Sequence, residues 1–151
     1  MPIFGKGNTL NLIHQDGLPG YAPKAAITLT LDEERRCLIF KPRVFKYDEV
    51  RLPLTKVTFA GYLAIEQIER QSKIGRAFVG GVLFGTAGAI VGAMTAEEKK
   101  RNKVFYVVNY ESEGETKAII LQDNGSNLNM NKFQKALNNY LPTKEPGTVT
   151  L

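Results

Sequence analysis

The sequence has little of the chemistry that catalysis and metal binding require. Its 151 residues include one cysteine, one histidine and no tryptophan. A single cysteine excludes an intramolecular disulfide framework, and we expect Cys37 to be a small buried residue of a strand, where thiols are usually inert. His14 has no cysteine or carboxylate at metal-ligand spacing and is interpreted as solvated or structural. We therefore expect no enzyme activity, no metal and no cofactor.

Signals for nucleotide binding and for export are also missing. Gly80 and Gly85 have the spacing of a phosphate-binding loop, but Thr86-Ala87 stands where lysine followed by serine or threonine is needed. Gly85 and Gly88 lack the preceding glycine of a dinucleotide fingerprint. The amino terminus has no basic start followed by an apolar run of about 7 to 15 residues, so we expect no secretory signal and a cytoplasmic protein.

What the sequence does have is a run of twenty residues without an ionisable side chain, between Arg76 and Glu97. Glycine and alanine recur four apart in it, which on a helix would make a smooth stripe. A straight helix of that length, about 30 Å, could cross a membrane. A single crossing would, however, put the strands before and after it on opposite sides. We therefore predict an insert, 76–97, that forms a helical hairpin with arms 77–84 and 89–96.

The apolar residues of the hairpin must be buried away from water, and three alternatives remain: they insert into a membrane, pack against a second copy of the chain, or pack against their own barrel. The residues expected at an interface or in a membrane are Phe78, Gly81, Val82, Phe84, Gly85, Gly88, Ile90 and Gly92. Basic residues flank the insert on both sides, namely Arg70, Lys73 and Arg76 before it and Lys99, Lys100, Arg101 and Lys103 after it. These flanks and the net charge of +5 favour an anionic surface.

The rest of the chain alternates apolar and polar residues as half-buried strands do. We predict strands over 26–31, 37–41, 50–54, 56–68, 104–110 and 117–121. Pro53 limits the third to an edge or bulge, and Gly61 bends the fourth. An amphipathic helix follows at 129–141. Residues 1–20 are expected to be an extension that covers part of the core or forms a short edge strand, and 142–151 a polar tail.

Three segments resemble the bacterial pleckstrin-homology-like (PH-like) domains, and they read ITLTLDEERRCLIFKP, VRLPLTKVTF and VFYVVNYESEGETKAIIL. The insert SKIGRAFVGGVLFGTAGAIVGAMT is similar to one found in small prokaryotic proteins of this type, bacterial or phage. The resemblance implies an α+β, mainly β domain at 21–141, a barrel of about six or seven antiparallel strands capped by a C-terminal helix. The basic loop residues that bind phosphoinositides in eukaryotic members have no counterpart here.

The sequence thus predicts a non-enzymatic module whose glycine-rich hairpin mediates self-association or membrane attachment, with a homo-oligomer or an anionic membrane surface as partner. The alternative is a soluble binding protein for an anionic ligand, such as nucleic acid or an acidic protein, in which the hairpin is plain core. Nucleic acid is the weaker candidate. The aromatic residues next to the basic flank, Phe105 and Tyr106, lie in the strongest strand pattern and are needed for the core.

Overall fold

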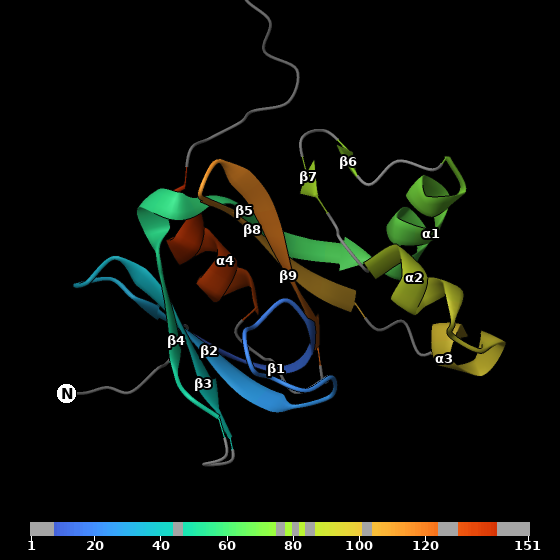
Figure 1. Ribbon diagram of the computed structural model, residues 1–151, viewed down its shortest axis with the longest axis horizontal. Coiled ribbons are helices and arrows are strands. Elements are labelled where there is room, and N and C mark those ends of the chain that lie inside the picture. Colours follow the sequence, from blue (N-terminus) through green and yellow to red (C-terminus); the bar gives the residue numbers. More distant parts are fainter. Residues whose placement is uncertain are drawn as a thin grey trace, which may run out of the picture.

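Seven strands form one antiparallel sheet in the computed structural model of the chain (Figure 1), in the order β4-β3-β2-β1-β9-β8-β5. The structure describes residues 8–43, 47–74, 78–79, 82–83, 87–100, 104–123 and 130–141, with the backbone alone at 71–74, 78–79, 82–83 and 99–100. The strands of this sheet are β1 (Thr9–Asp16), β2 (Ala26–Asp32), β3 (Cys37–Pro42), β4 (Val50–Pro53), β5 (Val57–Ala64), β8 (Val104–Ser112) and β9 (Glu115–Asp123).

The predicted hairpins are confirmed, because the alternation along each strand matches its two environments. In β2, Ile27, Leu29 and Leu31 are buried, while the residues between them are half-buried. A turn at 33–36 joins β2 to β3, and Arg36 takes the left-handed backbone conformation there, with φ of 52°. Glu113 and Gly114 make the turn between β8 and β9 in the same conformation. Short local turns therefore set the register of both hairpins.

The C-terminal helix α4 (Met130–Asn138) covers the inner core, as predicted. Phe133 and Leu137, one turn apart, are fully buried against the inner face of the sheet. A polar contact fixes the helix in place: the Tyr106 hydroxyl donates to Gln134 Oε1 at 3.0 Å, and Gln134 Nε2 donates to the Ala60 carbonyl at 2.7 Å. The helix is thus held to β8 and β5 by both apolar packing and hydrogen bonds.

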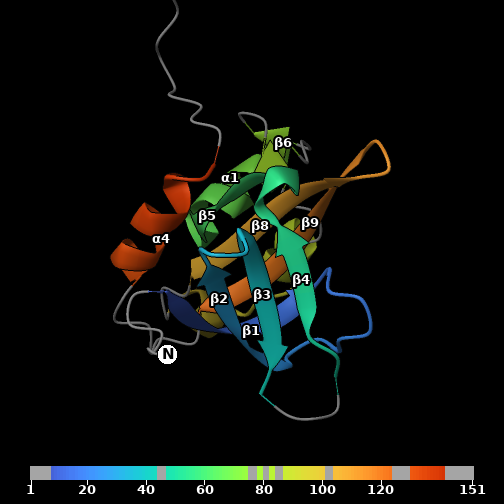
Figure 2. The ribbon, with the colours of Figure 1, turned by 90° about the vertical axis from the view of Figure 1, so that its left-hand side faces the viewer.

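The sheet curls but does not close. Strands β4 and β5 are its two edges, and the short 3-10 helix η1 (Leu54–Lys56) connects them. Figure 2 shows α4 on one side of the curled sheet and the loop between β1 and β2 on the other. The mainly β architecture is therefore confirmed, whereas the predicted closed barrel is not.

Two strand predictions need correction. Strand β1 lies between β2 and β9, so it is an interior strand rather than an edge, and the sheet begins inside the segment expected to be an extension. The predicted strand over 56–68 ends at Ala64, where helix α1 (Ile65–Ile74) begins. Gln67 explains the change, because its Oε1 accepts the Ala64 backbone N–H at 2.8 Å and so caps the helix. A register shift in β5 lies between Val57 and Phe59.

The histidine holds the loop between β1 and β2. His14 is buried, and its Nε2 accepts the Leu18 backbone N–H at 3.1 Å. Its Nδ1 then carries the proton and donates to the Ala22 carbonyl at 2.9 Å. The same loop passes close to β9 at Gly17, whose φ is +105° and where a Cβ would collide with the Ala118 carbonyl oxygen and lie 2.7 Å from Ile119 Cα. The structural interpretation of the histidine is confirmed.

Two glycines of this loop provide a matched test of that close approach. Gly20 is also left-handed, with φ of +79°, but a Cβ there meets nothing within 4 Å. We expect Gly20→Ala to cost about 1–2 kcal/mol of unfolding free energy, the ordinary penalty for a left-handed alanine. Gly17→Ala should cost at least about 2 kcal/mol more, because it also pushes the loop off β9. Urea unfolding measures both variants, and equal losses would contradict the close approach.

Candidate functional site

The described elements between β5 and β8 pack on the outer face of the sheet, and from here on we use the word insert for this whole segment, 65–100, which includes the predicted insert 76–97. Its described elements are α1, the strand pair β6 (Phe78–Val79) and β7 (Val82–Leu83), α2 (Ala87–Gly92) and α3 (Ala96–Lys100). Figure 1 shows α1, α2 and α3 together at one end of the molecule, away from α4. Helices α1 and α2 contact one another, and β7 contacts β9. The insert is therefore a second layer on the sheet.

A second hydrophobic core fixes this layer. It joins Ile65 and Ile68 of α1, Ala87 and Val91 of α2, Phe105 and Val107 of β8, and Ile120 of β9. The outer residues of β8 would otherwise be exposed, since its inner residues already fill the first core. A strand that is apolar on both faces needs a cover on each. The sequence leaves three possible partners that could shield the apolar residues of the insert from water. The described part of α2 packs on one of them, the chain's own sheet.

Helix α2 has two unlike faces. Ala87 and Val91, one turn apart, are buried in the outer core, with exposed fractions of 0% and 1%. The other side of the helix carries small residues that are half-buried or exposed: Gly88, Ala89, Gly92 and, just past the helix end, Ala93. We call these four residues the small face. A Cβ added at Gly92 meets nothing within 4 Å, so the space above it is open.

The first arm of the predicted helical hairpin is wrong. Phe78 pairs with Leu83 and Val79 with Val82 in an antiparallel ribbon, and α2 begins at Ala87, before the second predicted arm starts at 89. Glycine in a helix interior costs about 1 kcal/mol relative to alanine, while aromatic and β-branched residues favour strands. In the sequence, Gly-Gly separates the two paired segments, and that dipeptide suits a tight β-hairpin.

The second predicted arm is not one continuous helix, and a helix cap marks the point where the next helix begins. The predicted arm 89–96 stops being helical after Gly92, and α3 begins at Ala96. Thr95 Oγ1 accepts the Glu98 N–H at 3.2 Å, and Glu98 Oε1 accepts the Thr95 N–H at 3.1 Å. This reciprocal pair is a capping box, and the spacing of threonine and glutamate in the sequence signals it. That signal was missed in the sequence interpretation.

The predicted site residues divide between described and undescribed parts of the chain. Gly88 and Gly92 lie on the small face, and Ile90 is half-buried against the outer core. Phe78 and Val82 are in the ribbon, with only their backbone described. Of the basic flanks, Arg70 is exposed on α1, Lys73 belongs to α1, and Lys99 and Lys100 belong to α3. Gly81, Phe84, Gly85, Arg76, Arg101 and Lys103 lie outside the described residues.

Catalytic chemistry has little support at the remaining candidate positions. Cys37 is buried, as predicted, and burial raises the pKa of its thiol, with the negative charge of Asp32 raising it further. The thiol therefore stays protonated at neutral pH. Within the described ranges, no three histidine, cysteine, aspartate or glutamate residues gather where a metal could bind. None of the helices in the described part is both long and apolar enough to cross a membrane.

Comparison with known proteins agrees with this architecture. A family model described as a glycine zipper containing PH domain matches residues 21–111, more than half of the chain. The match runs from just before β2 into β8 and so includes the whole insert. The predicted resemblance to PH-like domains with a glycine-rich insert is confirmed. Searches of the curated proteins and of the solved structures returned no match.

Truncating Val91 tests whether α2 belongs to the outer core. We expect Val91→Ala to lower the unfolding free energy by about 1.5–3 kcal/mol, because it removes two methyl groups from a packed site. The control Lys132→Ala alters an exposed position of α4, outside the outer core, and should change stability by less than about 0.5 kcal/mol. Urea denaturation compares the two, and a loss at Val91 no larger than at Lys132 would mean that α2 does not pack on the sheet.

Proposed function

The chain belongs to the family of glycine zipper containing PH domains, and on this basis we propose that it is a non-enzymatic assembly module that joins a second copy of itself through the small face of α2. A PH-like domain is a scaffold for binding or assembly, so its function depends on what is attached to it. The observation that carries the proposal is the division of α2 into a face packed on its own sheet and a face of exposed small residues.

The small face has the pattern that lets two helices approach closely. Gly88 and Gly92 are four residues apart, as are Ala89 and Ala93, so all four residues lie on one side of the helix. Small residues in this arrangement allow backbones to come into van der Waals contact, and the same patch on a second copy would be complementary to it. Because Ala87 and Val91 already hold α2 in place, no helix needs to form on association.

The small face favours a protein partner over lipid on energetic grounds. Its only side-chain carbons are the methyl groups of Ala89 and Ala93. At about 0.8 kcal/mol for each buried carbon, these two contribute under about 2 kcal/mol in a membrane. That is much less than a single myristoyl chain, which itself gives marginal membrane binding. Close packing between backbones, by contrast, requires that side chains be absent.

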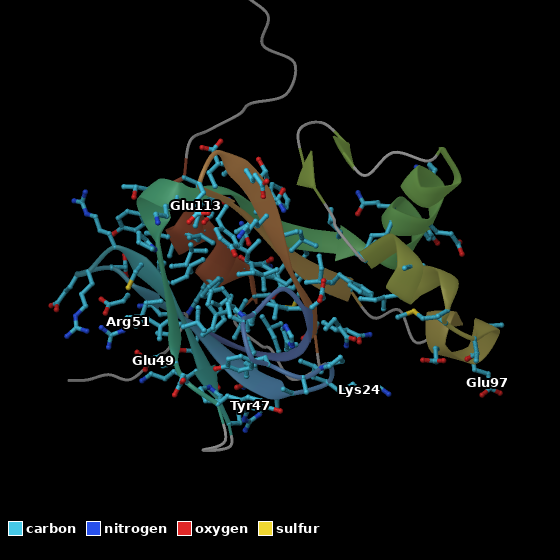
Figure 3. The ribbon with its side chains drawn as sticks, in the orientation of Figure 1. Lys24, Tyr47, Glu49, Arg51, Glu97 and Glu113 are labelled. Atoms are coloured by element: carbon cyan, nitrogen blue, oxygen red, sulfur yellow. The ribbon has the colours of Figure 1, made fainter. Side chains whose placement is uncertain are left out.

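Neighbouring helices supply the charged border that a self-complementary contact needs. Helix α3 carries Glu97 and α1 carries Arg70, and both residues are exposed. Figure 3 shows Glu97 at the outer end of α3, away from the sheet. Each copy therefore offers both signs of charge beside α2. Since α2 is only about 9 Å long, α1 and α3 must contribute area for the contact to reach about 1,000 Å².

Enlarging Gly92 tests the proposal without disturbing the monomer. We expect the wild-type chain to be a dimer or larger at roughly 100 μM, and Gly92→Leu to be a monomer, because the new side chain fills the space that the second helix occupies. A Cβ at Gly92 meets nothing in the monomer, so the variant should fold normally. Light scattering gives the mass, and circular dichroism checks the fold.

Asn131→Leu is the matched control, since it also places a leucine at an exposed helix position, but on α4, far from the insert. We expect this variant to keep the wild-type mass. A wild-type monomer at the highest concentration, or unchanged assembly of Gly92→Leu, would contradict the proposal. Flotation of a monomeric wild-type chain with anionic vesicles would assign the insert to a membrane instead.

A further inference from the structure

A cavity lies at the open seam of the sheet, on the side opposite α4. Its volume is about 170 Å³, and it is bordered by the whole of β4, by the loop between β1 and β2, by the end of β8 and by the middle of β9. Figure 1 shows β4 to the left of α4 and β9 to its right. The apolar lining residues include Leu18, Pro19, Val50, Leu52, Tyr110 and Ile119.

One wall of this cavity is an unpaired strand edge. The Leu54 backbone N–H donates to the Arg36 carbonyl at 2.9 Å. Hydrogen-bonded pairs alternate along an antiparallel ladder, so Leu52 and Val50 turn their backbone groups toward β3, and Arg51 and Pro53 turn theirs away. Proline has no N–H. The outer edge of β4 therefore offers the N–H and C=O of Arg51 and the C=O of Pro53, and no strand in the described part of the chain pairs with it.

The size of the cavity selects its occupant. Pockets for cofactors and drug-sized molecules run from about 300 to 1,000 Å³, so 170 Å³ is too small for either. It is large enough for one aliphatic or aromatic side chain. An extended segment beside β4 would hydrogen-bond to Arg51, and its side chains would alternate between the two faces. The residue opposite Arg51 would face solvent, and its neighbour would point inward, beside Val50 and Leu52.

Charge at the rim indicates the chemistry of the flanking residue. Arg51 and Lys56 are exposed and border the cavity. Glu49 accepts from Arg51 Nε at 2.7 Å (Figure 3), which leaves the terminal guanidinium nitrogens of Arg51 for a second carboxylate. In the described part of the chain, Lys56 forms no ion pair. An acidic residue next to the apolar one would therefore find a cation on the protein.

We propose that the outer edge of β4 and the cavity beside it bind an extended peptide of another protein, which adds a strand to the sheet, places one apolar side chain in the cavity and presents an adjacent acidic residue to Arg51 and Lys56. The added strand would fill the seam between β4 and the hairpin of β8 and β9. This site does not involve α2, so the peptide-binding proposal and the assembly proposal are tested separately.

The test is selection of a phage-displayed library of random eight-residue peptides on the immobilised full chain. We expect the selected peptides to share an apolar residue next to aspartate or glutamate. Synthetic versions should shift the amide resonances of Arg51, Leu18 and Ile119 in titrations followed by NMR. Arg51→Pro removes the outward N–H without breaking the ladder to β3, since proline is tolerated on an outer edge. The Arg51→Pro substitution should weaken binding of the selected peptides about tenfold or more.

Two further variants separate the contributions. Arg51→Ala keeps the N–H and removes only the charge, so it should weaken binding less than Arg51→Pro does. Ser112→Phe fills the cavity from β8 and leaves β4 intact, so it should block binding even if the proline variant does not fold. No shared pattern among selected peptides, resonance shifts confined to the insert, or full binding by Ser112→Phe would overturn the proposal. Concentration-dependent shifts at Arg51 without peptide would assign the edge to a second copy and overturn it too.

Discussion

Strand β8 is buried on both of its faces, and the rest of the structure depends on this constraint. Tyr106 and Val108 face the inner core under α4, while Phe105 and Val107 face the outer core under the insert, and all four are fully buried. Each such side chain contributes about 1.5–3 kcal/mol when it leaves water. Neither layer can be removed without exposing half of this strand. The sheet and the described helices of the insert therefore form one folding unit.

This double burial decides what the glycine-rich segment can do. Alanine and valine, four residues apart, fix α2 to the sheet, and the packing supplies the order that glycine opposes. With that face occupied, only the small residues on the opposite side are left for a partner. At the other end of the sheet, the order of the strands leaves β4 without a neighbour in the described part of the chain. The fold thus presents two surfaces of different chemistry, a small-residue helix face and an open strand edge.

Much of the fold could be predicted because local patterns match local environments. The alternation in β2 and the helical spacing of Phe133 and Leu137 both survive in the structure. The structure of the insert could not be predicted from local patterns, because the glycine spacing suggests a helix while Phe78 and Val79 favour a strand. Pairing with β7 decides between the two. Strand β1 was underestimated since a buried polar residue, His14, interrupts its apolar pattern. The faces of α2 depend on the need to cover β8, a contact between distant segments that no local pattern reveals.

Disulfide cross-linking between copies tests the proposed self-association most directly. In a Cys37→Ala background, Ala89→Cys puts a single thiol on the small face, and Asn131→Cys puts one on α4 as a control. Closely packed helices bring matching positions within reach of a disulfide, which needs Cα atoms about 4.4–6.8 Å apart. We expect rapid formation of a cross-linked dimer at position 89 under mild oxidation and little at 131. Equal, slow cross-linking at both positions would show that α2 does not join two copies.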